Sequence, residues 1–235
     1  MLVNPTNFQH AHLQAAIVDL DGTMVDTMGD FVAALNGMLG ELSLAPVERP
    51  AVERMVGKGS EHLIRAVLQH VGAPEGRYEA ALQAYQLHYL RINGQYSAVY
   101  PGVLDGLRDL RRRGLKLACL TNKPTAFVRP LLQAKGLDGC FDVVFGGDAF
   151  ERKKPDPLPL VKACEALATQ PHNTLMIGDS SNDAQAARAA GCPVLLVTYG
   201  YNHGDPVRAV DADGFVDSLA ELGALLTPVS PASPP

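Results

Sequence analysis

Short apolar runs alternate with helical patterns along most of the chain. Each run is too short for a globular helix and is followed by a polar or glycine-containing turn. The five runs lie at residues 15–20, 115–120, 141–145, 174–177 and 193–197. Strands that alternate with helices in this way predict an α/β fold, in which a doubly wound parallel sheet is covered by helices on both faces.

One interval in this alternation is far longer than the others. Roughly ninety residues separate the first two apolar runs, whereas a crossover between parallel strands needs only about 10–12. Helical patterns fill the interval at 28–42, 47–56, 60–71 and 75–92. We therefore expect two parts, an α/β catalytic core formed by 1–26 and 99–226 and an inserted helical cap at 27–98. The last stretch, 227–235, is rich in proline and serine and predicts a disordered tail.

The composition excludes several classes of protein. Hydrophobic residues make up 47% of the 235 residues and charged residues 19%, which is typical of a globular chain with a sizeable core. The net charge of −5 lacks the basic excess that binds nucleic acid. No stretch approaches the roughly 18 apolar residues of a membrane span, and the cysteines form no CxxC pair. We expect a cytoplasmic monomer or homodimer without a membrane or nucleic-acid partner.

Carboxylates follow two of the predicted strands. The first strand ends with Asp19 and Asp21, and the fourth is followed by Asp179 and Asp183. Because the carboxyl ends of parallel strands meet at one edge of a sheet, we expect these side chains to lie close together. Carboxylates crowded in this way are costly unless a cation offsets their charge. Oxygen ligands without histidine or cysteine favour a hard ion, so the sequence predicts a Mg²⁺ site.

A magnesium site of this kind accepts phosphate oxygens, so a small phosphate ester is the expected substrate. The carboxylate of Asp19 is a competent nucleophile for phosphorus once the metal screens its charge. Asp21, two residues on, can place its carboxyl on the other side of the phosphoryl group. There it would protonate the leaving oxygen and then deprotonate the attacking water, as a general acid and base.

Other polar groups at the same edge complete the predicted site. The Thr121 hydroxyl follows the second strand, and Lys154 lies in the basic run after the third. Backbone and side-chain donors at Gly22, Thr23 and Asn122 are assigned to substrate binding, because donors aimed at the phosphoryl oxygens stabilise their charge. Lys154 would offset that charge in the transition state.

Four motifs carry a resemblance to a known family. In chain order they are IVDLDGT, LTNK, KKPDP and IGDSSND, and together they resemble the haloacid dehalogenase-like hydrolase superfamily. The resemblance implies a Rossmann-like sheet of order 5-4-1-2-3 with a helical cap inserted after the first motif. It also implies Asp19 as nucleophile and Asp21 as acid and base. Mg²⁺ is then held by Asp19, the main-chain carbonyl of Asp21 and Asp179, with Asp183 nearby either as an additional ligand or as a residue that supports the ligands without touching the metal.

Longer segments are similar to the phosphoglycolate phosphatase family. They include LTNKPTAFVRPLL, FGGDAFERKKPDPLPL and, in the cap, VGKGSEHLIRAVL. This resemblance implies hydrolysis of 2-phosphoglycolate to glycolate and phosphate, with the loop around Gly59 facing the core. We predict that Lys58 in that loop is a partner for the carboxylate of a small acidic substrate.

Three alternatives stay open at this point. The enzyme acts on another small phosphate ester, such as a sugar phosphate or nucleotide, or it transfers phosphate as a β-phosphoglucomutase does. In a different class, the chain is a signalling module that resembles a response-regulator receiver and stores phosphate on Asp19. The carboxylate of Asp21 argues against the last alternative, since a general base there makes a phosphoaspartate short-lived.

Overall fold

A parallel sheet forms the centre of the molecule in the computed structural model, which describes residues 12–226. Its strands are β1 (Ala15–Val18), β4 (Lys116–Leu120), β5 (Val143–Phe145), β6 (Thr174–Gly178), β7 (Val194–Val197) and β8 (Gly214–Val216). The order across the sheet is β5-β4-β1-β6-β7-β8, and every neighbouring pair is parallel. The five predicted strands therefore lie in the expected order, and β8 adds a sixth at the edge beside β7.

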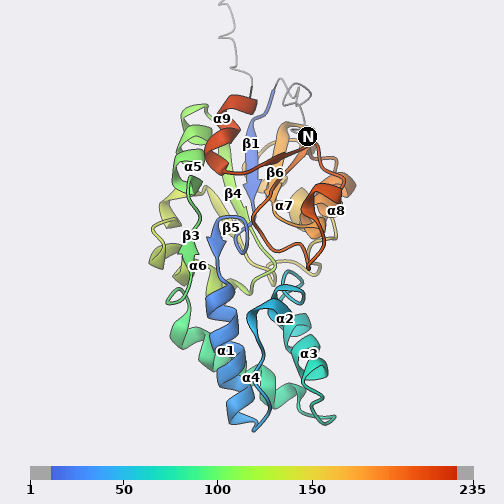
Figure 1. Ribbon diagram of the computed structural model, residues 1–235. Helices are drawn as coiled ribbons and strands as arrows, with labels where there is room; N and C mark the ends of the chain where they lie inside the picture. Colours follow the sequence, from blue (N-terminus) through green and yellow to red (C-terminus); the bar gives the residue numbers. More distant parts are fainter. Residues whose placement is uncertain (1–11, 227–235) are drawn as a thin grey trace, which may run out of the picture.

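Helices cover both faces of the sheet (Figure 1), which confirms the predicted fold class. They are α5 (Val103–Arg112), α6 (Thr125–Ala134), α7 (Leu158–Leu167), α8 (Ser181–Ala190) and the short α9 (Leu222–Leu225). Short 3₁₀ turns lie at Asp138–Cys140, Pro171–Asn173, Val207–Ala209 and Leu219–Glu221.

Alternation along the strands divides the core into two layers. In β1, Ala16 and Val18 pack into the apolar cluster that contains side chains of α5, α6 and α9. Ala15 and Ile17 point to the opposite face and join the cluster with α7 and α8. All four residues are fully buried, so β1 has the continuous apolar character of a strand covered on both sides.

The long interval between β1 and β4 forms a separate layer of helices. These are α1 (Met28–Glu41), α2 (Arg49–Glu53), α3 (Ser60–His70) and α4 (Tyr78–Ile92), and we refer to them together as the cap. The cap lies beyond one end of the sheet (Figure 1) and has its own apolar cluster, centred on buried side chains of α1, α3 and α4. The domain boundaries at 26/27 and 98/99 stay predictions.

The chain passes between core and cap twice, and the two crossings pair with each other. They are the antiparallel strands β2 (Val25–Asp26) and β3 (Ala98–Val99). Asp30, fully buried in the first turn of α1, accepts hydrogen bonds from the backbone N–H groups of Gly94 at 2.8 Å and Tyr96 at 2.7 Å. The start of the cap is thereby tied to the segment that leaves it.

Within residues 12–226, no helix has both the length and the apolar character needed to cross a membrane. The four cysteines are free thiols, three of them buried. The predicted tail at 227–235 lies outside the described residues.

Candidate active site

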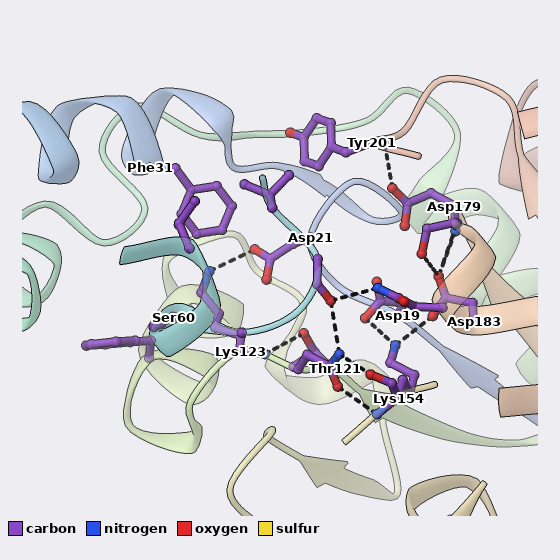
Figure 2. A pocket seen from close by; sticks show the side chains of 18 of the residues that line it. Asp19, Asp21, Phe31, Ser60, Thr121, Lys123, Lys154, Asp179, Asp183 and Tyr201 are labelled. Atoms are coloured by element: carbon purple, nitrogen blue, oxygen red, sulfur yellow. Dashed lines mark hydrogen bonds and ion pairs between the residues drawn. The ribbon is translucent and has the colours of Figure 1, made fainter. Parts of the chain in front are cut away.

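A pocket lies between the carboxyl ends of the central strands and the cap (Figure 2). Core and cap residues line it together, among them Asp19, Asp21, Phe31, Gly57, Gly59, Ser60, Leu63, Tyr85, Tyr89, Thr121, Asn122, Lys123, Lys154, Asp179, Asp183 and Tyr201. The cavity measures about 40 Å³, and a water needs roughly 10–15 Å³ by this measure. The cap therefore lies close over the site and leaves little room.

Three of the predicted carboxylates converge in this pocket. Asp19 follows β1, Asp179 follows β6, and Asp183 lies in the first turn of α8. One oxygen from each lies within 4.8 Å of the others, and all three residues are buried. Burial, together with the charge of Asp183, raises the pKa of Asp19 to about 7 even though Lys154 opposes the change. Burial and then the charges of Asp183 and Asp19 also raise the pKa of Asp179.

This set of donors fits a hard divalent cation. The ligand atoms are all carboxylate oxygens, which Mg²⁺ prefers over softer metals. Burial is the largest cause of the raised pKa values of Asp19 and Asp179, and the neighbouring carboxylates add to it, so the ionised cluster is costly without further positive charge. A bound divalent ion would supply that charge.

Lys154 is the cation that bridges two of these carboxylates. Its Nζ lies 2.8 Å from Asp19 Oδ1 and 2.7 Å from Asp183 Oδ1, and it donates to the Leu120 carbonyl at 3.0 Å. Burial alone would lower the pKa of Lys154, but the charges of Asp183 and Asp19 raise it above its ordinary value. Lys154 therefore contacts three oxygen atoms of the protein, and its contact with Asp19 is an ion pair.

Asp183 also shapes the start of α8. Its Oδ2 accepts hydrogen bonds from the backbone N–H groups of Asp179 and Ser180, both at 3.2 Å, and from the Ser180 hydroxyl at 2.8 Å. Ser180 is the N-cap residue, so Asp183 at the third helical position completes a capping box. One carboxylate oxygen therefore fixes the loop after β6, and the other contacts Lys154.

The Asp21 side chain points away from the three converging carboxylates and toward the cap (Figure 2). Its Oδ1 accepts hydrogen bonds from the Thr27 hydroxyl at 2.7 Å and from Lys123 Nζ at 2.8 Å. Three of the four residues predicted to bind the metal bring their carboxylates together. The fourth, Asp21, is predicted to bind through its main-chain carbonyl, so the position of its side chain does not test that prediction. This orientation leaves the Asp21 carboxyl beside the pocket, where its expected work is proton transfer.

The turn after β1 supports Asp179. Gly22 has φ +84, and a Cβ there would lie 2.2 Å from Asp179 Oδ2, so only glycine fits. The Thr23 hydroxyl donates to Asp179 Oδ1 at 3.2 Å, and Thr23 is fully buried. Gly22 and Thr23 were predicted to bind substrate; the structure places them behind Asp179, outside the residues that line the pocket.

Thr121 and Asn122, at the end of β4, both line the pocket and are buried. The Asn122 amide donates to the Lys154 carbonyl at 2.8 Å and to the Gly57 carbonyl of the cap at 3.0 Å. Asn182 on α8 donates to the same Gly57 carbonyl at 3.1 Å. Two core amides thus converge on one cap carbonyl and hold the loop before α3 against the core.

The two predicted cap residues differ in position. Gly59 lines the pocket, whereas its neighbour Lys58 is exposed and is not among the lining residues. The prediction that Lys58 pairs with the substrate carboxylate is not tested by this geometry and stays a prediction.

Lys123 and Tyr201 also line the site and are not among the catalytic, metal-binding and substrate-binding residues predicted above. Lys123 belongs to the LTNK motif and lies two positions after Thr121. Its closeness to Thr121 in the sequence was the one indication that it lies near the site. Tyr201 donates its backbone N–H to Asp179 Oδ2 at 2.5 Å, and its hydroxyl donates to Asp26 in β2. Tyr201 follows the fifth predicted strand, a position compatible with the mouth of the site and equally with packing; the structure places it in the pocket lining.

Comparison with known proteins agrees with this geometry. The model of the family described as haloacid dehalogenase-like hydrolase matches residues 16–197. The phosphoglycolate phosphatase of Nitrosospira multiformis is 44% identical over 219 residues, which covers 91% of this chain and 96% of that protein. The plasmid-encoded phosphoglycolate phosphatase of Cupriavidus necator is 44% identical over 215 residues, which covers 91% of this chain and 93% of that protein.

A solved structure shows the same fold. The crystal structure of a predicted phosphoglycolate phosphatase from Haemophilus somnus is similar with a TM-score of 0.86 and 30% identity, covering 89% of this chain and 96% of that one. The structure of CbbY from Rhodobacter sphaeroides in complex with phosphate is similar with a TM-score of 0.78 and 26% identity, covering 91% and 99%.

Proposed function

The chain belongs to the haloacid dehalogenase-like hydrolase family, and on that premise we propose that it is a Mg²⁺-dependent phosphomonoester hydrolase acting on 2-phosphoglycolate. The observation that carries the proposal is the convergence of Asp19, Asp179 and Asp183 on one point, with Lys154 between Asp19 and Asp183. The two phosphoglycolate phosphatases at 44% identity over most of the chain support the choice of substrate.

The metal would be held by the carboxylates of Asp19, Asp179 and Asp183, and the family resemblance adds the main-chain carbonyl of Asp21. When bound, Mg²⁺ supplies positive charge that screens the repulsion between the Asp19 carboxylate and the phosphate dianion. The contacts of Thr23 and Tyr201 with Asp179 fix the orientation of this metal ligand.

In the first half-reaction, an Asp19 oxygen attacks phosphorus and forms an aspartyl-phosphate. The bond between phosphorus and the ester oxygen breaks, and that oxygen takes a proton from Asp21 as glycolate leaves. Asp21 is placed for this work because it lines the pocket, and Thr27 and Lys123 hold its carboxyl there.

In the second half-reaction, the Asp21 carboxylate takes a proton from water while the water oxygen attacks phosphorus. The bond between phosphorus and Asp19 breaks, phosphate leaves, and both aspartates return to their starting states. Lys154 stays beside Asp19 throughout, so its charge offsets the charge on the transferred group. The Thr121 hydroxyl and the backbone around Asn122 line the pocket where the phosphoryl oxygens would bind.

The cap closes the site over the substrate. The contacts of Asn122 and Asn182 with the Gly57 carbonyl hold it against the core, where it excludes water from the reacting atoms. The cap residues Gly57, Gly59 and Ser60 line the pocket together with the core carboxylates, so a substrate bound there is enclosed between the two parts.

A phosphate-release screen tests the proposal. Phosphoglycolate, sugar phosphates and nucleotides are compared with Mg²⁺ and with EDTA, using wild-type enzyme and the Asp19→Asn variant. The proposal predicts the highest kcat/KM for phosphoglycolate, no turnover in EDTA, and no turnover by Asp19→Asn although its circular dichroism is unchanged. Preference for a sugar phosphate or nucleotide would contradict the substrate, and substantial turnover by Asp19→Asn would contradict covalent catalysis.

A further inference from the structure

The pocket contains a second buried cation, Lys123, that the steps above use only as a support for Asp21. Its side chain is 2% exposed, and its Nζ lies 2.8 Å from Asp21 Oδ1. Among the pocket-lining residues of the described chain, Lys123 and Lys154 are the two that carry positive charge. Lys154 is already occupied by Asp19, Asp183 and a carbonyl. The steps above assign Lys154 to the charge of the phosphoryl group, so Lys123 is the pocket-lining cation that remains for a second negative group of a ligand.

Lys123 has unused capacity for such a partner. An ammonium group has three donors, yet within residues 12–226 the Asp21 carboxylate is its one hydrogen-bond acceptor. The remaining surroundings are aromatic: Nζ lies 4.6 Å from the centre of the Phe31 ring and 4.7 Å from that of Tyr89. These rings stabilise the cation without saturating its donors.

A second polar group beside Lys123 has no hydrogen-bond partner among the described residues. The hydroxyl of Tyr89 is buried, and among the described residues no hydrogen-bond partner reaches it. Tyr89 lines the pocket from α4, and its ring contacts Lys123. A buried hydroxyl without a partner is costly, and an acceptor supplied by a ligand would satisfy it.

The position of Lys123 matches the covalent structure of phosphoglycolate. One methylene group separates the ester oxygen of this substrate from its carboxylate. A group that binds the carboxylate must therefore lie next to the group that protonates the ester oxygen. Lys123 satisfies this requirement, because its Nζ is in hydrogen-bond contact with Asp21. Figure 2 shows Lys123 on the side of Asp21 away from Asp19 and Lys154.

We propose that Lys123 is the specificity-determining residue that binds the substrate carboxylate, an inference that rests on the function proposed above. The phosphoryl group binds among Asp19, Lys154 and the metal ligands, and the carboxylate binds the free donors of Lys123 beneath Phe31 and Tyr89. Some phosphate esters carry no anionic group one carbon from the ester oxygen. When such an ester binds, Asp21 is the one anionic partner of Lys123. Lys123 thus selects two-carbon acidic esters over neutral ones.

Two substrates that differ only at the distal group test this role. Phosphoglycolate carries the carboxylate, and 2-hydroxyethyl phosphate carries a neutral hydroxymethyl group in its place. The readout is the ratio of kcat/KM for the two, measured for wild-type enzyme and for Lys123→Met. Because both substrates need Asp21 equally, any effect of the substitution on Asp21 cancels in the ratio. We expect the ratio to fall by about 10- to 100-fold, the range for a hydrogen bond to a charged group.

Three further variants make the result decisive. Lys123→Gln keeps a donor for Asp21 while removing the charge, so it gives the same readout if Lys123→Met does not fold. Lys162→Met removes an exposed lysine paired with Glu165 on α7 and is expected to keep the wild-type ratio. Lys58→Met tests the competing candidate in the cap loop and is expected to change the ratio much less than Lys123→Met.

The outcomes separate the inference from the function beneath it. Wild-type enzyme that shows no preference for phosphoglycolate would overturn the proposed function and this inference with it. Wild-type preference that survives in both Lys123 variants would overturn the inference alone. An equal loss of kcat/KM for both substrates in the Lys123 variants would also overturn the inference alone, because it indicates a purely structural role for Lys123. Loss of the preference for phosphoglycolate in Lys58→Met, and not in the Lys123 variants, would overturn it as well.

Discussion

Replacing Lys154 with methionine gives a measurable test of the electrostatics at the site. The substitution keeps the length and apolar stem of the side chain but removes the cation between Asp19 and Asp183. The carboxylate oxygens of Asp19 and Asp183, which lie within 4.8 Å of each other, then have no lysine cation between them. At an effective dielectric constant of about 20, charges at that separation repel by about 3.5 kcal/mol. Removing one partner of a buried ion pair costs a similar amount, about 3–5 kcal/mol.

The assay is urea unfolding followed by circular dichroism, in EDTA and in Mg²⁺. We expect Lys154→Met to lose about 3–5 kcal/mol in EDTA and to regain part of the loss in Mg²⁺, which replaces some of the missing charge. The control Lys162→Met breaks an exposed pair with Glu165 and should cost less than about 0.5 kcal/mol.

A double variant tests the cause of this loss. Asp183→Asn removes one of the two carboxylates that repel each other once Lys154 is gone. The double variant Lys154→Met/Asp183→Asn should therefore lose less free energy of unfolding than the sum of the losses in the two single variants. A loss by Lys154→Met below about 1 kcal/mol, or losses that simply add, would refute the electrostatic reasoning.

Three further substitutions test separate parts of the account. Asp179→Asn should abolish the thermal stabilisation by Mg²⁺, which in wild-type enzyme reaches about 2.7 kcal/mol at 100 times Kd; an unchanged Mg²⁺ shift in calorimetry would argue against Asp179 as a ligand. Gly22→Ala should lose more than about 1 kcal/mol and most of its activity, because the new Cβ meets Asp179 Oδ2 at 2.2 Å; wild-type stability and turnover would contradict this. Asp21→Asn should lower kcat for phosphoglycolate by about 10²- to 10⁴-fold without changing circular dichroism, and steady-state kinetics would show whether it does.

Much of the sheet could be predicted because its strands are buried on both faces and read as continuous apolar runs. β8 was missed because it has three residues, two of them only half-buried, and follows a long irregular segment. The paired crossings β2 and β3 have two residues each and show no period that a sequence pattern could reveal. The cap helices were predicted with their approximate ends because glycine and proline punctuate them.

The site was predictable where one rule applied to several residues. Polar residues at strand ends must gather at one edge of a parallel sheet, and this placed Asp19, Asp179 and Thr121 together. Lys123 follows the same strand end as Thr121, but its surroundings come from three other segments, which supply Asp21, Phe31 and Tyr89. No local sequence pattern indicates how a cap helix and a core loop pack together. The surroundings of Lys123 could therefore be learned only from the structure.

The covalent intermediate is the most direct measurement of the proposed chemistry. Asp21→Asn enzyme is mixed with p-nitrophenyl phosphate and Mg²⁺, because this leaving group departs without protonation while hydrolysis of the intermediate still needs the base. The reaction is quenched, reduced with borohydride and analysed by peptide mass spectrometry. The account predicts a burst of one nitrophenolate per enzyme and conversion of residue 19 to homoserine only when substrate and Mg²⁺ are both present. An unmodified Asp19, or reduction at another aspartate instead, would contradict it.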